Sequence, residues 1–185
     1  SGLGAGFLAP LLAGSKIVMV GRWSAEAAAE LIGREKVTMF SGVPTMMWDI
    51  VRAGQHLNAD LSSLRNVGMG GQALSVGLLN EFRAACPDVV MGTGYGMTET
   101  AGSVAMGMGE DFIRKSASAG RALSLVEMRI ETPDGTVLPT GSAGEIVVRG
   151  PMVMQGYWQQ PEATAAVLSL DGWLRTGDIG YLDDE

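Results

Sequence analysis

The chain has 185 residues, enough for one compact domain or two small ones, and 46% of them are apolar, so a core can form without disulfides. The formal net charge is −7, and the 13 Lys and Arg residues are scattered singly. This pattern argues against a nucleic-acid groove or an anionic membrane surface, because both need clustered positive charge.

Cysteine content and hydropathy bear on the cellular setting. The single cysteine, Cys86, excludes an intramolecular disulfide and favours a reduced, cytoplasmic location. No segment approaches the roughly 20 apolar residues of a membrane span. The apolar opening also lacks the basic start and the cleavage pattern of a signal peptide.

The first 105 or so residues alternate helix-like and strand-like segments. Helices are expected from an N-cap at Ser24 to about Lys36, from Pro44 onward, and from Ser75 to near Pro87. Short apolar strands are expected at 37–40, 67–70 and 89–91. Strands that alternate with helices indicate a parallel sheet covered by helices, and uniformly apolar strands are typical of such a sheet.

The pattern changes after about Glu110. Strand-like segments with turn signals between them follow at 126–132, 145–149, 173–176 and 179–182. This spacing indicates a small β-barrel or sandwich. We therefore expect an α/β fold of two parts: residues 1–110 with the parallel sheet, and residues 111–185 as a small β-barrel-like subdomain.

The segment GYGMTET, residues 94–100, places a ring, a hydroxyl and a carboxylate close together after a predicted strand. Tyr95 can stack on a base, a contact worth about 1–3 kcal/mol, or it can be a core ring beside a tight turn. The spacing alone favours neither interpretation. If a helix starts here, Thr98 is a natural N-cap, and because a helix N-terminus favours anions, this role is compatible with phosphate binding. Glu99 is either a magnesium ligand or a solvated carboxylate of the first helical turn.

Two other segments are candidates for the same site. The backbone of residues 70–73 can meet an adenine, although a Gly-Gly pair is more often only a turn. Asp178, after Thr176-Gly177, can accept hydrogen bonds from a ribose diol, although alone it reads better as a turn aspartate. Since ligands of parallel sheets bind beyond the carboxyl ends of the strands, loops 70–72 and 94–96 are expected in one pocket.

Other reactive residue types give weaker signals. His56, the one histidine, reads as a solvated loop residue, and too few ligands exist for a zinc site. Cys86 reads as a small buried residue rather than a nucleophile. Most methionines are expected to fill core gaps, although Met47, Met91 and Met97 can also line an apolar pocket.

Together these motifs resemble the adenylate-forming superfamily of acyl-CoA synthetases, firefly luciferases and peptide-synthetase adenylation domains. The likeness rests on GYGMTET and on the stretch from GEIVVRG to YLDDE, with FSGVPTMMWDIV and NVGMGGQALS, and so covers essentially the whole chain. Met97 stands where peptide-synthetase domains usually have proline, and Gln72 where they tend to have glutamate. The resemblance therefore favours the acyl-CoA synthetase, or fatty-acid–CoA ligase, branch.

The resemblance implies a role for each matching residue. Tyr95 would stack on the adenine, Asp178 would bind the ribose hydroxyls, and Val43 would approach the acyl group. Thr98 would bond phosphate oxygens and Glu99 would hold Mg²⁺, and these two are the catalytic candidates. Gly71, Gln72 and Ala73 would border the adenine, and Gly94 and Gly96 would leave space where the acyl chain meets the nucleotide. Met97 is the remaining cofactor-binding candidate.

The implied reaction joins a carboxylic acid, expected to be a fatty acid, to coenzyme A at the expense of ATP, through an acyl-adenylate that releases pyrophosphate and then AMP. The family's phosphate loop would precede Ser1, and its hinge and C-terminal lysine would follow Glu185. The chain thus resembles a middle part of the large N-terminal domain and is expected to be inactive alone. The alternatives are a non-catalytic nucleotide-binding or structural fragment, and an adenylating enzyme with a carrier-protein acceptor.

Overall fold

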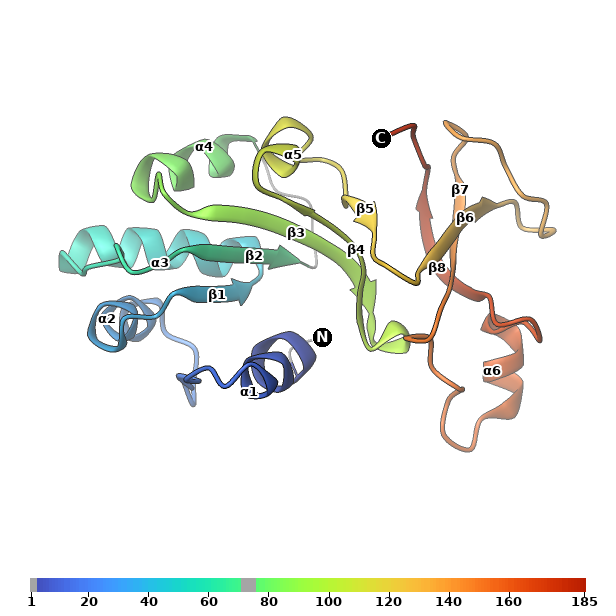
Figure 1. The fold of residues 1–185 in the computed structure, drawn as a ribbon, viewed down its shortest axis with the longest axis horizontal. Coiled ribbons are helices and arrows are strands. Elements are labelled where there is room, and N and C mark those ends of the chain that lie inside the picture. Colours follow the sequence, from blue (N-terminus) through green and yellow to red (C-terminus); the bar gives the residue numbers. More distant parts are fainter. Residues whose placement is uncertain (1–2, 71–75) are drawn as a thin grey trace. The chain divides into compact units, whose positions relative to one another are not determined.

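A computed structural model describes residues 3–70 and 76–185 (Figure 1). The chain divides into two compact units, which interleave in sequence. Of the described residues, 3–70, 76–95 and 106–120 form the α/β unit, and 96–105 and 121–185 form the β unit. Strand β3 (Val90–Met97) and strand β4 (Gly102–Met108) each contribute to both. The expected division into domains at residue 110 stays a prediction.

The α/β unit contains the expected parallel strands. Strand β1 (Met39–Gly42) pairs in parallel with β2 (Asn66–Gly70), and β2 pairs in parallel with β3. The order in the sheet that contains these strands is β1-β2-β3-β4-β5, and its last strand, Arg121–Ala122, is counted in the β unit. The described helices of the α/β unit are η1 (Gly4–Leu8), α1 (Ala9–Leu12), α2 (Ala25–Glu35), α3 (Pro44–Leu57), α4 (Val76–Ala85) and α5 (Gly109–Arg114).

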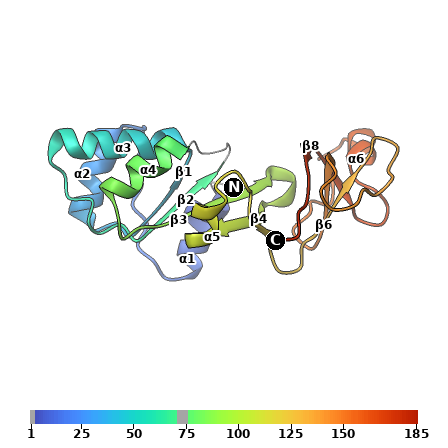
Figure 2. The ribbon, with the colours of Figure 1, turned by 90° about the horizontal axis from the view of Figure 1, so that it is seen from above.

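Local sequence signals explain the helix ends. The side chain of Ser24 accepts a hydrogen bond from the backbone N–H of Ala27 (3.2 Å), as expected for the N-cap of α2. Lys36 ends this helix in the left-handed conformation (φ 52°), and Pro44 opens α3. Helices α2, α3 and α4 lie together beside the parallel strands (Figure 2), and their apolar faces supply most of the core. Ser75, the expected cap of α4, lies outside the described residues.

Strand β3 extends further than the sequence predicts. Residues 94–97, expected in a loop, are its last residues, and the 3₁₀ helix η2 (Thr98–Thr100) connects it to β4. Strands that neighbour each other across so short a connection must be antiparallel. Gly96 permits this close return, because a Cβ there would lie 1.9 Å from the carbonyl oxygen of Gly102. Gly96 therefore allows β3 and β4 to approach each other closely. From the sequence alone, a glycine with this role looks the same as a glycine in a loop.

The β unit holds an antiparallel sheet in the order β6 (Glu127–Glu131), β7 (Gly144–Arg149) and β8 (Leu174–Gly180), with helix α6 (Pro161–Val167). Where a barrel-like subdomain was expected, the described residues form this three-stranded sheet. The two strands expected at 173–176 and 179–182 are the single strand β8. A register shift opposite it, between Glu145 and Val147, lets the strand continue through Gly177 and Asp178.

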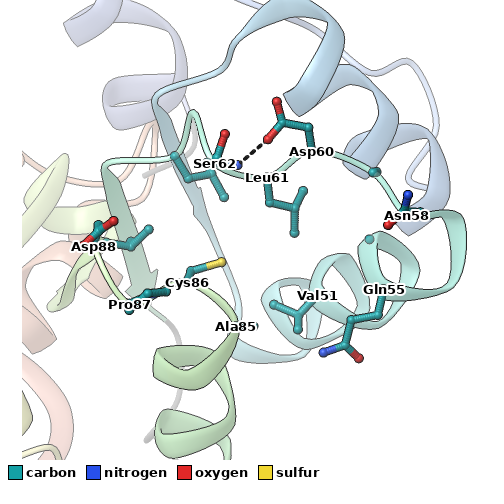
Figure 3. Close-up of a pocket in the computed structure, with 14 residues that line it drawn as sticks. Val51, Gln55, Asn58, Asp60, Leu61, Ser62, Ala85, Cys86, Pro87 and Asp88 are labelled. Carbon is teal, nitrogen blue, oxygen red and sulfur yellow. Dashed lines mark hydrogen bonds between the residues drawn. The ribbon is translucent and has the colours of Figure 1, made fainter.

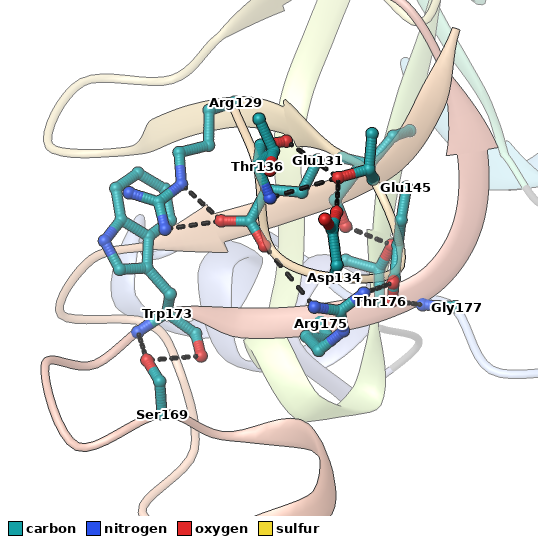
Figure 4. Close-up of polar contacts among 12 residues, drawn as sticks. Arg129, Glu131, Asp134, Thr136, Glu145, Ser169, Trp173, Arg175, Thr176 and Gly177 are labelled. Carbon is teal, nitrogen blue, oxygen red and sulfur yellow. Dashed lines mark hydrogen bonds and ion pairs between the residues drawn. The ribbon is translucent and has the colours of Figure 1, made fainter. Parts of the chain in front are cut away.

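Alternating charges connect the three strands of this sheet (Figure 4). The Arg129 guanidinium binds Glu131 (2.6 Å from Nε to Oε1), and the Arg175 guanidinium lies between Glu131 and Glu145, contacting both carboxylates. Glu131 is only 5% exposed, so these partners compensate a buried charge. The Arg129 guanidinium also lies over the ring of the buried Trp173, 3.9 Å from its centroid. The sheet therefore depends on ion pairs as well as on its apolar face.

Replacing Gly96 by alanine should destabilise the chain by about 1–3 kcal/mol, the usual cost of overpacking, because the β3–β4 approach leaves no room for a methyl group. Gly77→Ala is the matched control. Gly77 lies in helix α4 with open space around its Cβ position, so alanine there should be neutral or stabilise by up to about 1 kcal/mol. Urea unfolding measures both, and an unchanged midpoint for Gly96→Ala would contradict the close approach.

Replacing Glu145 by alanine should cost about 1–3 kcal/mol of unfolding free energy, because the half-buried Arg175 then loses an ionic partner. Glu127→Ala removes a more exposed ion pair, with Arg149, on the same sheet and should cost less than about 1 kcal/mol. Thermal or urea unfolding of the two variants compares them. Equal losses would show that the Glu145 pair is no stronger than a surface ion pair.

Candidate functional site

The turn after β3 is closed by a buried threonine. Thr100 is 1% exposed, and its hydroxyl oxygen accepts a hydrogen bond from the N–H of Met97 (3.0 Å). The same hydroxyl has two carbonyl acceptors within reach, on Gly102 (2.8 Å) and Met97 (3.0 Å). The expected N-cap role of Thr98 is wrong: the residue before η2 is Met97, and the capping hydroxyl comes from Thr100. Thr98 itself is exposed.

Glu99 is fixed through its main chain and its side chain. Its carbonyl accepts a hydrogen bond from the N–H of Met154 (2.8 Å), and its Oε1 accepts one from the hydroxyl of Tyr157 (2.8 Å). Because this bond uses the phenolic proton, it raises the pKa of Tyr157 above its usual value. Tyr157 was not among the expected site residues. No local signal identifies it, since the contact spans 58 residues.

An irregularity within strand β8 gives Asp178 a defined main-chain position. Gly177 adopts φ +76°, and its N–H donates to Glu145 Oε1 (3.1 Å). The N–H of Asp178 donates to Thr176 Oγ1 (3.1 Å), and the Thr176 hydroxyl donates to the carbonyl of Ile146 (2.7 Å). The Asp178 side chain is exposed. Asp178 lies within β8, where the register shift in the pairing with β7 leaves a strand irregularity instead of the expected turn, and its role as a ribose-binding carboxylate stays a prediction.

The other expected site residues lie in the α/β unit or outside the description. Gly70, the last residue of β2, is paired in register with Gly94, so the carboxyl end of β2 lies beside β3 three residues before that strand ends. Tyr95, the next residue of β3, is half-buried. Val43 precedes α3 and is 40% exposed. The expected adenine-bordering residues Gly71, Gln72 and Ala73 lie outside the described residues.

Several secondary expectations have clear outcomes. Met47 and Met91 are each 1% exposed core residues and line no open surface, whereas Met97 is half-buried. Cys86 is buried as expected, and burial raises the pKa of its thiol. His56 is exposed as expected but lies in the last turn of α3 instead of a loop.

A cavity of about 410 Å³ lies elsewhere in the α/β unit (Figure 3). It is lined by the C-terminal ends of α3 and α4 and by the segments that lead into β2 and β3, including Asp60, Cys86 and Asp88. These segments precede the strands, so the cavity lies at their amino ends. It is therefore separate from the edge at which Gly70 and Gly94 lie.

The described residues also limit how a metal ion can be bound. Across 3–70 and 76–185, no three or more His, Cys, Asp or Glu side chains are grouped to hold a metal ion by themselves. Magnesium in nucleotide sites commonly uses one or two carboxylates and takes its other ligands from phosphates and water. A single oriented carboxylate such as Glu99 fits that mode.

Within the described residues, 3–70 and 76–185, no helix has the length and apolar character to cross a membrane.

Comparison with known proteins places the chain in a family. The family model for AMP-binding enzymes matches residues 1–158. The chain is 38% identical over 182 residues to 4-coumarate–CoA ligase 3 of Oryza sativa subsp. japonica, covering 96% of the chain and 33% of that protein. The chain thus spans about a third of the length of this relative.

Solved structures give the same result. The amide bond synthetase McbA from Marinactinospora thermotolerans matches with a TM-score of 0.83 and 35% identity, over 92% of this chain and 34% of that one. O-succinylbenzoate coenzyme A synthetase (MenE) from Bacillus subtilis, in complex with ATP and magnesium ion, matches with a TM-score of 0.83 and 35% identity, over 95% and 35%. The resemblance drawn from the sequence motifs is therefore confirmed, and the chain belongs to the family of AMP-binding enzymes.

Proposed function

We propose that this chain is the nucleotide-binding part of an adenylate-forming acid–thiol ligase, which activates a carboxylic acid with ATP and transfers the acyl group to coenzyme A. One observation carries the proposal beyond family membership. Within the β unit, the backbone and carboxylate of Glu99 are both held by hydrogen bonds, at the position where the family motif would hold Mg²⁺. An oriented acidic side chain of this kind suits a metal–nucleotide better than a solvated surface role.

Each residue of the proposed site has a separate task. Asp178 accepts hydrogen bonds from the ribose hydroxyls, and Tyr95 stacks on the adenine. Thr98 donates its hydroxyl proton to a phosphate oxygen, and Glu99 with the phosphates would hold Mg²⁺. When bound, the ion would offset the phosphate charge during adenylation. The described residues that would take part lie in β3, in η2 and within β8, whereas Gly71, Gln72 and Ala73 complete the set as the family motif implies.

The reaction needs no covalent nucleophile from the protein. The substrate carboxylate forms a bond to the α-phosphorus of ATP, and the bond to pyrophosphate breaks. The thiol of coenzyme A then attacks the acyl carbon and AMP leaves. The protein contributes orientation and phosphate-charge stabilisation. We expect the isolated chain to be inactive, because it spans only a third of the length of its relative.

The names of the similar proteins bear on the acid and the acceptor. One relative is a 4-coumarate–CoA ligase and one solved structure is an O-succinylbenzoate coenzyme A synthetase, which supports an aromatic acid ahead of the fatty acid expected from the sequence. Another solved structure is an amide bond synthetase, so an amine is the second candidate acceptor. A carrier-protein acceptor and a cytoplasmic location stay predictions.

Isotope exchange between pyrophosphate and ATP tests the proposal on the full-length protein. The acids offered are 4-coumarate, o-succinylbenzoate and a series of fatty acids, followed by coenzyme A or an amine. Acid-dependent exchange and a thioester product support the proposed ligase. An amide product would identify an amine as the acceptor. If no acid supports exchange between pyrophosphate and ATP, the proposed adenylating function is overturned.

Replacing Asp178 by alanine should weaken AMP binding by about 10- to 100-fold, because one or two hydrogen bonds to a charged acceptor are lost. Asp134→Ala is the control: this carboxylate is exposed in the turn after β6, where it accepts a hydrogen bond from Thr132. Isothermal titration calorimetry with AMP measures both variants on the full-length protein. Equal affinities for wild type and Asp178→Ala would remove Asp178 from the nucleotide site.

A further inference from the structure

The hydroxyl of Tyr157 donates a hydrogen bond to Oε1 of the Glu99 carboxylate (2.8 Å). We propose that Tyr157 is a positioning residue, which holds Oε1 of Glu99 so that the other oxygen, Oε2, is directed to the metal–nucleotide. This inference rests on the proposed function and names a residue outside the motif that carries it.

The position of Tyr157 is itself fixed. Its backbone N–H donates to Thr164 Oγ1 (2.9 Å), and the Thr164 hydroxyl donates to the carbonyl of Gln160 (2.8 Å) at the start of α6. The preceding Gly156 has φ +150°, and a Cβ there would lie 2.8 Å from the Thr164 side chain. The chain therefore comes close enough to α6 for Thr164 to anchor the tyrosine.

The same segment also holds the backbone of Glu99. The N–H of Met154 donates to the Glu99 carbonyl (2.8 Å), three residues before Tyr157 bonds the carboxylate (2.8 Å). All of these residues belong to the β unit. One short segment thus fixes both where Glu99 lies and how its side chain is turned.

The chemistry of the contact suits an orienting role. A phenol donates a proton to an ionised carboxylate, and such charge-assisted bonds are stronger than neutral ones. Only one carboxylate oxygen takes part, which leaves the second to act as a metal ligand. Hydrogen bonds to coordinating carboxylates typically contribute 10- to 100-fold to metal affinity.

The competing explanation is a purely structural contact that joins the η2 turn to the 154–157 segment. In that case, loss of the hydroxyl would loosen the turn and weaken every nucleotide alike. A positioning role is selective, because AMP binds without magnesium whereas ATP binds with it. The two explanations therefore differ in which ligand loses affinity.

The test compares AMP without metal and ATP with excess Mg²⁺, by isothermal titration calorimetry on the full-length protein. Tyr157→Phe removes only the hydroxyl, and Tyr181→Phe is the control at an exposed tyrosine of the same unit. We expect Tyr157→Phe to weaken Mg–ATP binding about 10-fold or more and to leave AMP binding unchanged. In the Glu99→Gln background, the same change should have no further effect on either ligand.

Three results would overturn the positioning role: unchanged Mg–ATP affinity, equal weakening of both ligands, or a full additional loss in the Glu99→Gln background. Circular dichroism checks that each variant is folded. If Tyr157→Phe folds poorly, Thr164→Val is the second variant, because it releases the backbone N–H of Tyr157 but keeps the Tyr157 hydroxyl. This variant should also weaken Mg–ATP binding and leave AMP binding unchanged. A wild-type protein that binds neither ligand would instead overturn the proposed function itself.

Discussion

The buried hydroxyl of Thr100 closes the turn on which the proposed site depends. It bonds back to Met97 and forward to Gly102, so the ends of β3 and β4 are joined across a single turn of 3₁₀ helix. Thr98 and Glu99 are carried on that turn, one exposed and one half-buried. The positions of Thr98 and Glu99, the proposed phosphate and metal residues, therefore depend on the buried side chain of Thr100, which itself would touch no ligand.

A second constraint acts through the antiparallel sheet. Glu145 contacts the Arg175 guanidinium with one oxygen and accepts the Gly177 N–H with the other. The ion pair that stabilises the sheet thus also fixes the irregular part of β8 that carries Asp178. Because the charged groups are partly withdrawn from water, loss of one partner leaves the other poorly compensated. Stability of the sheet and geometry of the proposed ribose contact are consequently linked.

Sequence alone identified the features that depend on near neighbours. Ser24 and Pro44 mark helix starts through local capping and backbone geometry, and the apolar strands predict a parallel sheet. Glycine signals were ambiguous at Gly96 and Gly177: both indicate turns, yet both lie within strands. At these two glycines, strand pairing and a register shift determine the backbone conformation. A short stretch of sequence contains information on neither.

The site shows the same division between local and distant information. GYGMTET could be assigned from its residue types and its family likeness, but its anchor at Tyr157 required a contact across 58 residues. Thr98 and Thr100 are both plausible caps in the sequence, and only the buried hydrogen bonds select Thr100. Residues that act on the ligand are therefore easier to predict than the residues that orient them.

A crystal structure of the full-length protein with ATP and Mg²⁺ tests the central claim most directly. The account predicts the ribose hydroxyls within hydrogen-bond distance of the Asp178 carboxylate, and the metal ion bound by Glu99 while Tyr157 holds its other oxygen. A nucleotide bound with both carboxylates turned to solvent would contradict the account.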